Sequence, residues 1–364
     1  MPTISADELR VLTFDIFKKA GVESTVAQRV ADHLVDSNLV GMDSHGVLRL
    51  PSYVKWLREG QVARHDRIEV LKDHAATALL DAHFTFGPMA GLRAANLAVS
   101  KARQYGIGFV AVRNSSHTGR LGEYVEHIAQ EGFIGFMCCN AQGAGQVVAP
   151  WGGKDTRLST NPLAWGIPTG GDPMVLDMAT SAASEGKIRV KSRRHEKLPD
   201  GWAISVEGNP VTDASDFYGP PMGAILSAGH KGYGFALVVD ILAGAITGGG
   251  CARPVDHLHT PINGFVVMAI NVALFSAFSE FTAAVDGLFR YVKSSTPLHP
   301  GGRVLIPNEL ETNERRRRLA EGIELDDETW QQIVEAARSV GIEVGFSTDQ
   351  NSHRKLEWQA LSSS

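Results

Sequence analysis

Ser44, His45 and Arg49 form the first group of residues whose types could carry chemistry. If their segment is helical, His45 and Arg49 lie on one face, because residues four apart are neighbours on a helix. A guanidinium binds a carboxylate through two parallel hydrogen bonds, and an imidazole titrates near neutrality, which suits proton transfer to a nearby oxygen. The group therefore predicts a site for a carboxylic acid. The alternative is a helix cap at Ser44 with an exposed histidine and arginine.

Two neighbours of this group affect the prediction. Gly46 would let a ligand approach the imidazole of His45. Pro51 has no backbone N–H, so we expect it to bend or restart the helix before residues 53–57, which read as more helix.

A second histidine lies in the polar segment 114–120, between a buried apolar run and a predicted helix. Ligand sites of α/β proteins gather at the carboxyl ends of strands. His117 is therefore a second candidate for acid/base work. The alternative is a loop of turn-forming residues with a structural histidine. Asn140, the pair Thr160–Asn161 and Asp177 follow the same strand-end rule, but each is a weak signal alone.

The segment 229–234 places three glycines, His230 and Lys231 before an apolar helical run. A helix N-terminus with free N–H groups and a lysine favours an anion such as a pyrophosphate. The alternative is a tight turn with a surface lysine. The usual strand, G-x-G-x-x-G and helix fingerprint does not occur, since Pro150 and two glycines interrupt any helix after Gly143-Ala144-Gly145. Nucleotide binding would therefore need an uncommon scaffold.

The elements that must position these groups alternate between strands and helices, which predicts a layered α/β fold. The predicted strands are 78–82, 107–112, 134–140, 174–178 and 265–270. The predicted helices cover a segment capped by Ser5 and Glu8 and ended by Gly21, then 24–40, 88–105, 121–131, 234–245, 277–293, 311–321 and 326–340. The polar tail from Ser347 onward is expected to be loose.

Bulk composition excludes several classes of protein. The net charge of −5 argues against a nucleic-acid partner, and the basic runs 191–194 and 315–318 are expected to be solvated surface. Three cysteines without a C-x-x-C spacing indicate neither a disulfide framework nor a zinc site, and we expect no metal. Asp256, His257 and His259 are a weak metal alternative. No signal peptide or membrane span is visible, which predicts a cytoplasmic protein.

Several ordered motifs together resemble the malate/L-lactate dehydrogenase family of the type that lacks a classical Rossmann fold. The resemblance spans residues 5–341. Members of the family include sulfolactate, ureidoglycolate and diketogulonate enzymes and reductases of cyclic imino acids. The motifs are D-S-H-G-V-L-R-L at 43–50, N-S-S-H at 114–117, A-P-W-G-G at 149–153, T-N-P at 160–162, L-D-M-A-T-S at 176–181 and G-H-K-G-Y-G at 229–234.

The resemblance implies a three-layer α/β/α fold with a mixed sheet, a homodimer, and NAD or NADP as hydride carrier. It implies that Arg49 binds the substrate's carboxylate and that His45 or His117 moves the proton, with His45 favoured. The expected substrate-binding residues are Ser44, Arg49, Tyr53 and Asn140. The expected cofactor-binding residues are Arg120, Thr160, Asn161, Asp177, Met178, Ala179, His230, Lys231, Gly232 and Glu309.

Two departures from the family pattern stand out. Relatives carry P-G-E where this chain has Pro307-Asn308-Glu309, and asparagine tolerates the positive φ that the glycine would adopt. Relatives also usually carry a proline after the polar residue of the segment Ile270-Asn271-Val272, so we expect the departure to affect the local geometry there and not the activity.

The sequence thus predicts an NAD(P)-dependent oxidoreductase that interconverts a small 2-oxo acid and a 2-hydroxy acid. The alternative is a reductase of a cyclic 2-imino acid, since both reactions need a carboxylate clamp and a proton donor. A hydrolase using Ser44 or Ser116 is disfavoured, because no nucleophile elbow occurs, and so is a non-catalytic nucleotide binder. The expected regions are a helical one at 1–75 and 300–345, a cofactor-binding one at 76–299 and a flexible tail at 346–364.

Overall fold

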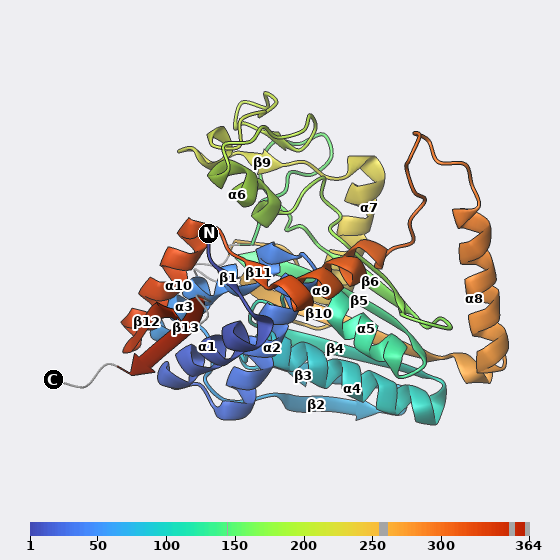
Figure 1. The fold of residues 1–364 in the computed structure, drawn as a ribbon. Coiled ribbons are helices and arrows are strands. Elements are labelled where there is room, and N and C mark those ends of the chain that lie inside the picture. Colours follow the sequence, from blue (N-terminus) through green and yellow to red (C-terminus); the bar gives the residue numbers. More distant parts are fainter. Residues whose placement is uncertain (144, 255–260, 349–353, 361–364) are drawn as a thin grey trace. The chain divides into compact units, whose positions relative to one another are not determined.

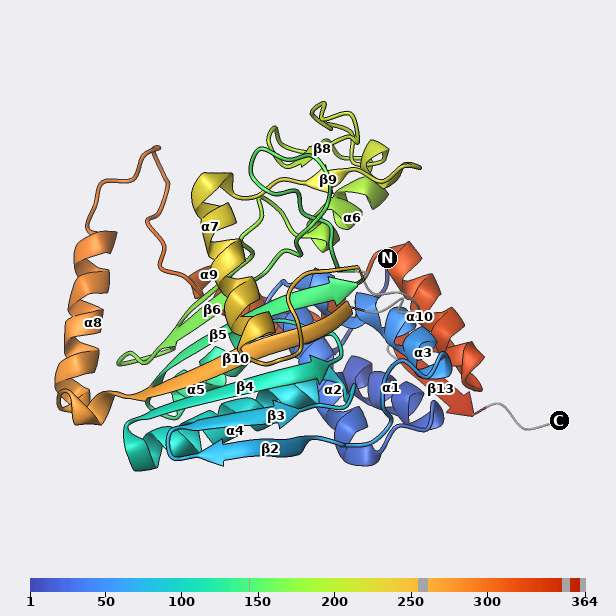
Figure 2. The same ribbon diagram turned by 180° about the vertical axis from the view of Figure 1, so that it is seen from behind.

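The computed structural model describes residues 1–143, 145–254, 261–348 and 354–360 (Figures 1 and 2). The chain divides into two compact units: unit 1 comprises residues 1–66 and 310–364, and unit 2 comprises residues 67–309. The boundaries predicted near residues 75 and 300 both lie inside unit 2. Asp256, His257 and His259, the weak metal alternative, lie outside the described residues.

Unit 2 is built on a seven-stranded sheet. Its strands, in spatial order, are β2 (Glu69–His74), β3 (Thr77–Asp81), β4 (Ile107–Ser115), β10 (Pro261–Asn271), β5 (Phe133–Gly143), β6 (Leu163–Ile167) and β7 (Met174–Met178). β3 and β4 are parallel and joined by a helix, whereas the other neighbouring pairs are antiparallel. The predicted mixed sheet is therefore confirmed.

Helices cover both faces of this sheet. α4 (Gly87–Tyr105) and α5 (Gly122–Gln130) pack on one face. α7 (Gly229–Asp240) and the π-helical turn η4 (Ile241–Ala245) lie on the other face, as Figure 2 shows. Buried alanines of α4 let the helix approach β4 closely: a side chain at Gly108 would come within 2.0 Å of the carbonyl of Ala98. The three-layer α/β/α arrangement predicted for this region is confirmed.

Unit 2 also holds elements outside the three layers. The longest is α8 (Phe278–Lys293), in which the described side chains are largely exposed. The shorter ones are α6 (Glu185–Arg193), β8 (Ala203–Ile204), η3 (Asp216–Tyr218), β9 (Ala224–Ile225) and η5 (Val272–Leu274).

Unit 1 is mainly helical. It contains β1 (Thr3–Ile4), α1 (Ala6–Lys19), α2 (Ser24–Leu39), the 3₁₀ turns η1 (Asp43–His45) and η2 (Val47–Arg49), α3 (Leu50–Arg58), most of α9 (Glu309–Glu321), β11 (Ile323–Glu324), α10 (Asp327–Ser339), β12 (Ile342–Thr348) and β13 (Arg354–Ala360). The capping box of Ser5 and Glu8 is confirmed at the start of α1. Residues 354–360, expected to belong to a loose tail, pair with β12 in an antiparallel hairpin.

Most element predictions agree with the structure to within a few residues. The predicted helix 234–245 begins earlier, at Gly229, and its last five residues are π-helical. No helix in the described part of the chain is long and apolar enough to cross a membrane.

Candidate functional site

The segment around His45 is not the single helix that the spacing of His45 and Arg49 suggested. It consists of η1 and η2, separated at Gly46, whose backbone is extended. The hydroxyl of Ser44 lies 3.0 Å from Nδ1 of His45, and Nε of Arg49 donates to the carbonyl of Ser44 over 2.7 Å. Ser44 therefore links the imidazole to the guanidinium, one through its side chain and the other through its backbone. We call residues 43–49 the His45 turn.

Gly46 has a different role from the predicted one. A Cβ atom at this position would lie 2.2 Å from Oδ1 of Asn38, and the same Oδ1 accepts a hydrogen bond from the N–H of Val47 over 2.8 Å. The residue is buried. The missing side chain makes room for Asn38, not for a ligand, so that prediction is wrong.

Tyr53, an expected substrate-binding residue, lies in α3 and is fully buried. α3 starts at Leu50 with Pro51 in its first turn, which confirms the predicted restart of the helix. The phenol ring packs between Phe17 and Trp56 at centroid distances of 6.4 and 5.4 Å. Burial raises the pKa of the Tyr53 hydroxyl, and the nearby charge of Arg49 opposes this shift. Tyr53 thus supports Arg49 as a neutral, packed neighbour.

In unit 2, His117 lies in the loop between β4 and α5, as predicted. Asn114, next to the last residue of β4, has a left-handed backbone (φ 53°), and β4 ends at Ser115, which still pairs with Asn263. Thr118 fixes the loop: its N–H and hydroxyl approach Oδ1 of Asn263 to 2.8 and 3.1 Å, and its carbonyl accepts from the hydroxyl of Tyr124. The backbone of His117 is therefore held by buried hydrogen bonds one residue away.

Asp177 and Arg120 lie beside the start of α5. The carboxylate of Asp177, at the end of β7, accepts a hydrogen bond from the N–H of Gly122 over 2.7 Å. The Arg120 side chain is 3% exposed and lies 3.4 Å from the carboxylate of Glu126. The N-terminus of α5 thus links the His117 loop to the end of β7. Met178 is exposed and Ala179 is partly exposed immediately after Asp177.

A second group of expected cofactor residues gathers around the first turn of α7. Thr180 donates its N–H and hydroxyl to the carbonyl of Thr160, both over 3.0 Å, and its own carbonyl accepts from the N–H of Ala228. Asn161 donates its side-chain amide to the carbonyl of Ala236. A Cβ at Gly232 would lie 2.5 Å from the carbonyl of Thr180, so only glycine fits there. We call residues 159–161, 177–181 and 227–232 the α7 cluster.

The N-terminus of α7 presents donors for an anion. Its N-cap is Ala228, which offers no side-chain oxygen to the first N–H groups, and Gly229 has φ 63°. His230 and Lys231 follow and are exposed. Uncapped N–H groups beside a lysine match what a pyrophosphate requires, so the residues present fit a dinucleotide.

Trp151 is a further candidate, which the sequence analysis named only as part of the motif A-P-W-G-G. It occupies the turn 150–153, in which the N–H of Gly153 donates to the carbonyl of Pro150 and Gly152 has φ 81°. The indole is 59% exposed, and its ring centroid lies 6.2 Å from that of His230. The motif A-P-W-G-G was visible in the sequence, but nothing in it showed that the indole would meet the start of α7.

Glu309 is the last residue of unit 2 and the first residue of α9. Its carboxylate accepts from the N–H of Ile306 and pairs with Lys293, and the hydrogen bond from Lys293 is the main reason that its pKa is lowered. Asn308 adopts φ 83° and donates its amide to the carbonyl of Pro173. The prediction that asparagine could take the glycine's conformation here is confirmed.

Asn140 is 1% exposed, and its polar atoms are engaged inside the fold. Its amide donates to the carboxylate of Asp240 over 2.6 Å and to the carbonyl of Gly250, while its Oδ1 accepts from the N–H of Gly264. These contacts fix the end of α7 to the sheet. Donation from the Asn140 amide to a substrate would require one of its two bonds to break, whereas Oδ1 can accept one further hydrogen bond.

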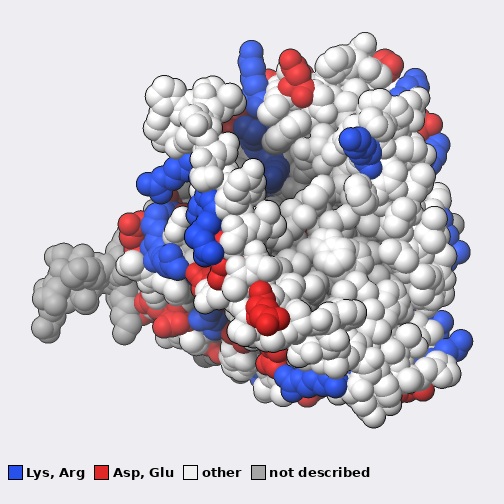
Figure 3. Space-filling view, turned by 90° about the vertical axis from the view of Figure 1, so that its right-hand side faces the viewer, with Lys and Arg blue, Asp and Glu red and all other residues white. Residues whose placement is uncertain are grey.

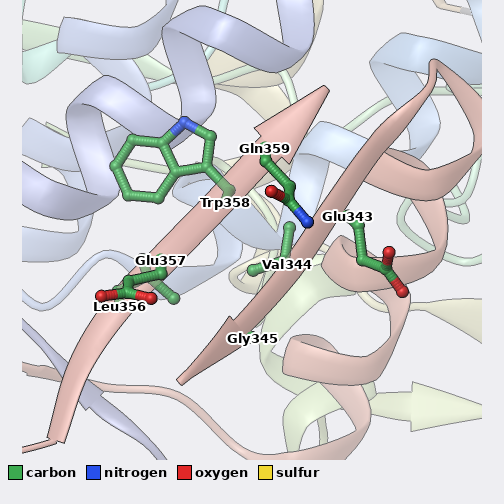
Figure 4. A pocket seen from close by; sticks show the side chains of 7 residues that line it. All are labelled: Glu343, Val344, Gly345, Leu356, Glu357, Trp358 and Gln359. Carbon is green, nitrogen blue, oxygen red and sulfur yellow. The ribbon is translucent and has the colours of Figure 1, made fainter. Parts of the chain in front are cut away.

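Two cavities differ in their suitability for an anionic ligand. One, of about 670 Å³, lies along the hairpin of β12 and β13 (Figure 4) and is lined by Glu343, Val344, Gly345, Leu356, Glu357, Trp358 and Gln359. Its two carboxylates would repel an acid. The other, of about 630 Å³, runs beside α7, and its charged lining residues are Arg157, Arg253 and Asp240, so two guanidiniums face one carboxylate. Its charge and its position beside α7 suit an anionic cofactor better.

Comparison with known proteins gives concordant results. The sequence pattern of the malate/L-lactate dehydrogenase family matches residues 4–334. The chain is similar to a malate dehydrogenase of Pyrococcus abyssi, with 37% identity over 93% of this chain and 95% of the relative. Among solved structures it resembles the sulfolactate dehydrogenase of Methanocaldococcus jannaschii, with a TM-score of 0.82 and 34% identity over 93% of this chain and 98% of that one.

A third relative is named as a reductase and not as a hydroxy-acid dehydrogenase. The structure of delta1-piperideine-2-carboxylate reductase from Pseudomonas syringae pvar. tomato matches with a TM-score of 0.80 and 29% identity. The match covers 93% of this chain and 100% of the reductase.

Proposed function

The chain belongs to the malate/L-lactate dehydrogenase family, and from this premise we propose that it interconverts a 2-oxo acid and a 2-hydroxy acid with NAD(H) or NADP(H). The observation that carries the proposal is the His45 turn. In this turn the hydroxyl of Ser44 contacts the imidazole of His45, and the carbonyl of Ser44 accepts from the guanidinium of Arg49. Proton transfer to an oxygen and binding of the neighbouring carboxylate require this pair of groups.

Arg49 is the residue we assign to the substrate's carboxylate. Its Nε is already bonded to the carbonyl of Ser44, which fixes the plane of the guanidinium. The terminal nitrogens of such a group can donate to both oxygens of one carboxylate. Binding by Arg49 orients the acid and neutralises its charge, and both effects lower the barrier for reaction at the adjacent carbon.

His45 is the residue we assign to the proton. The hydroxyl of Ser44 engages Nδ1, and this contact orients the ring so that Nε2 is the atom to exchange a proton with the substrate's oxygen. His117 is the alternative, since its loop is held equally firmly by Thr118. The imidazole gives the proton in reduction and takes it back in oxidation.

We assign the α7 cluster to binding of the cofactor. When bound, the cofactor would supply or accept the hydride at the carbon beside the carboxylate. His230, Lys231 and the uncapped N–H groups of α7 would hold its phosphates, and Gly232 lets this turn approach Thr180. Asp177, Met178 and Ala179 continue the same surface.

A reductase of a cyclic 2-imino acid is the second candidate function. The likeness to the piperideine-2-carboxylate reductase structure favours it. The same guanidinium would bind the carboxylate, and the nitrogen would stay protonated after reduction.

We also propose that the protein is a homodimer through the exposed face of α8. In this helix, Phe278, Leu288 and Tyr291 are 43, 57 and 79% exposed, and Phe275 before it is 80% exposed. Figure 3, which looks toward the side that carries α8, shows a broad area without charged side chains. Large hydrophobic side chains exposed on one helix mark an interface, and a second copy is the usual partner. Sedimentation equilibrium should therefore give twice the chain mass, and a single-chain mass would reject the dimer.

The absorbance of the reduced cofactor at 340 nm provides the test of the proposed reaction. Purified protein is mixed with NADH or NADPH and one of six acids: pyruvate, oxaloacetate, sulfopyruvate, diketogulonate, or the piperideine- or pyrroline-2-carboxylate. We expect loss of absorbance with one 2-oxo acid. Loss with a cyclic imino acid alone would establish the second candidate. Calorimetry that detects no binding of either cofactor would remove the basis of both.

A further inference from the structure

Arg318, in the last turn of α9, departs from the sequence prediction. The run Arg315–Arg318 was expected to be solvated, yet the Arg318 side chain is only 12% exposed. Its two terminal nitrogens bind the carboxylate of Asp43 in a bidentate manner, over 2.5 and 3.1 Å, and Nη1 also donates to the carbonyl of Asn38 over 2.7 Å. The prediction is therefore wrong for this residue, which joins α9 to the first residue of the His45 turn within unit 1.

Asn38, the second member of this network, reaches both sides of His45. Its amide donates to Oδ1 of Asp43 over 2.6 Å, and its Oδ1 accepts from the N–H of Val47 over 2.8 Å. Asn38 is 1% exposed, and the bare Cα of Gly46 packs against it. The chain on either side of Ser44–His45–Gly46 is thus tied to one buried side chain, and that side chain shares Asp43 with Arg318.

We propose that Arg318 is a positioning residue, which acts through Asp43 and Asn38 to fix the imidazole of His45 and the guanidinium of Arg49 relative to each other. The inference rests on the proposed function of the His45 turn. η1 and η2 are only three residues each, and such short 3₁₀ turns have poor hydrogen-bond geometry of their own. External side-chain bonds therefore supplement the few main-chain bonds of the turn, such as that from the N–H of Gly46 to the carbonyl of Asp43 over 3.0 Å.

Glu314 fixes Arg318 from the other side. Its carboxylate accepts from Nε of Arg318 over 2.5 Å and from two nitrogens of Arg317. The hydrogen bond from Arg317, aided by Arg318, lowers the pKa of Glu314 to about 2, so the carboxylate is charged at neutral pH. The Arg318 guanidinium therefore lies between the carboxylates of Glu314 and Asp43, and its bond to Glu314 helps to orient it toward Asp43.

Arg317 provides a matched control on the same helix. It is half exposed, and within the described residues its hydrogen bonds and ion pairs go to Glu314 and Glu321, both on α9. Arg317→Gln and Arg318→Gln remove the same charge from the same turn of helix. A difference between the two variants therefore reports on the link to Asp43.

The experiment compares kcat, KM and cofactor affinity of Arg317→Gln, Arg318→Gln, Arg318→Lys, Asp43→Asn and the double variant Asp43→Asn/Arg318→Gln. Because misplacement of a reacting group by about 1 Å can cost about 100-fold, we expect Arg318→Gln to lower kcat/KM for the acid by about 10- to 100-fold. Arg318→Lys should recover only part of this, and the double variant should lose no more than the worse single variant. Arg317→Gln should stay within about twofold of the parent, as surface ion pairs contribute little.

A second readout keeps the inference testable if no acid is turned over. The imidazole resonances of His45, assigned with His45→Gln, should shift or broaden in Arg318→Gln and not in Arg317→Gln, and cofactor affinity should be the same in both. Equal kinetics and equal His45 spectra in the two variants would overturn the inference. So would a loss in Arg318→Gln that is matched by equal loss of cofactor binding, since that pattern signals general unfolding. Absence of cofactor binding by the parent protein would instead count against the proposed function.

Discussion

The His45 turn in unit 1 and the α7 cluster in unit 2 are each stabilised by a different kind of hydrogen bond. Side chains from elements far apart in the sequence fix the His45 turn, namely Asn38 and Arg318 with their shared partner Asp43. The α7 cluster is fixed mainly by main-chain bonds, such as those joining Thr180 to Thr160 and Ala228 to Thr180.

This difference indicates which kind of substitution should disrupt each region. Loss of one polar side chain can release a turn that has few bonds of its own. A region held by its backbone tolerates such losses, but it does not tolerate atoms inserted where two chains approach closely, as at Gly232. We therefore expect the two regions to respond to opposite kinds of substitution.

The largest expected effect is that of His45→Gln. Removal of a general acid typically costs about 10²- to 10⁴-fold in rate, so we expect kcat in the reductive direction to fall by that amount while cofactor affinity stays unchanged. Steady-state kinetics and calorimetry measure the two quantities. His117→Gln is the paired variant, and a large fall in kcat there, with His45→Gln close to the parent, would move the proton donor to unit 2.

Gly232→Ala tests the vulnerability of the α7 cluster. The new methyl group would meet the carbonyl of Thr180 at 2.5 Å, so the first turn of α7 must shift. We expect a loss of about 1–3 kcal/mol in unfolding free energy and a rise in cofactor Kd of about tenfold, equivalent to ~1.4 kcal/mol.

Gly234→Ala is the control on the same helix. A Cβ atom at Gly234 would meet nothing within 4 Å, and alanine favours a helix by about 1 kcal/mol over glycine. Stability should therefore be equal or higher, with cofactor Kd unchanged. Equal behaviour of the two alanine variants would contradict the close approach of α7 to Thr180.

The smallest expected effect is that of Thr180→Val. This change removes a buried hydroxyl that donates to the carbonyls of Thr160 and Asn161 but leaves the main-chain bonds of Thr180 intact. We expect a loss of about 1 kcal/mol in denaturant unfolding and a cofactor Kd within about threefold of the parent. A larger loss of affinity would mean that side chains, not the backbone, hold this cluster.

The sequence predicts much of the fold because apolar periodicity and end signals coincide. Strand β7 was predicted at its observed bounds, 174–178, and α4 to within one residue at its start. Local rules are sufficient for these two elements, because neighbours in the sequence decide the conformation. The left-handed conformation of Asn308 was expected from the family's P-G-E motif together with the tolerance of asparagine for positive φ.

Contacts across long sequence separations could not be predicted. The bond between Arg318 and Asp43 joins residues 275 positions apart, and the charge pattern of α9 alone indicated only a solvated face. The spacing of His45 and Arg49 suggested a helix, whereas Asn38 packs at Gly46 and divides the segment into two turns. Trp151 could be named as part of a motif, but its proximity to His230 depends on how the turn 150–153 meets α7.

The most direct test of the proposed division of work is a crossed measurement on Arg49→Met and Lys231→Gln. Hydrogen bonds to charged groups contribute about 1.5–3 kcal/mol each, so we expect Arg49→Met to raise KM for the acid by about 100-fold or more and to leave cofactor Kd unchanged. Lys231→Gln should raise cofactor Kd by about tenfold with little change in KM for the acid at saturating cofactor. An unchanged KM in Arg49→Met, or a parallel loss of both affinities in either variant, would contradict the assignment of the acid to the His45 turn and of the cofactor to the α7 cluster.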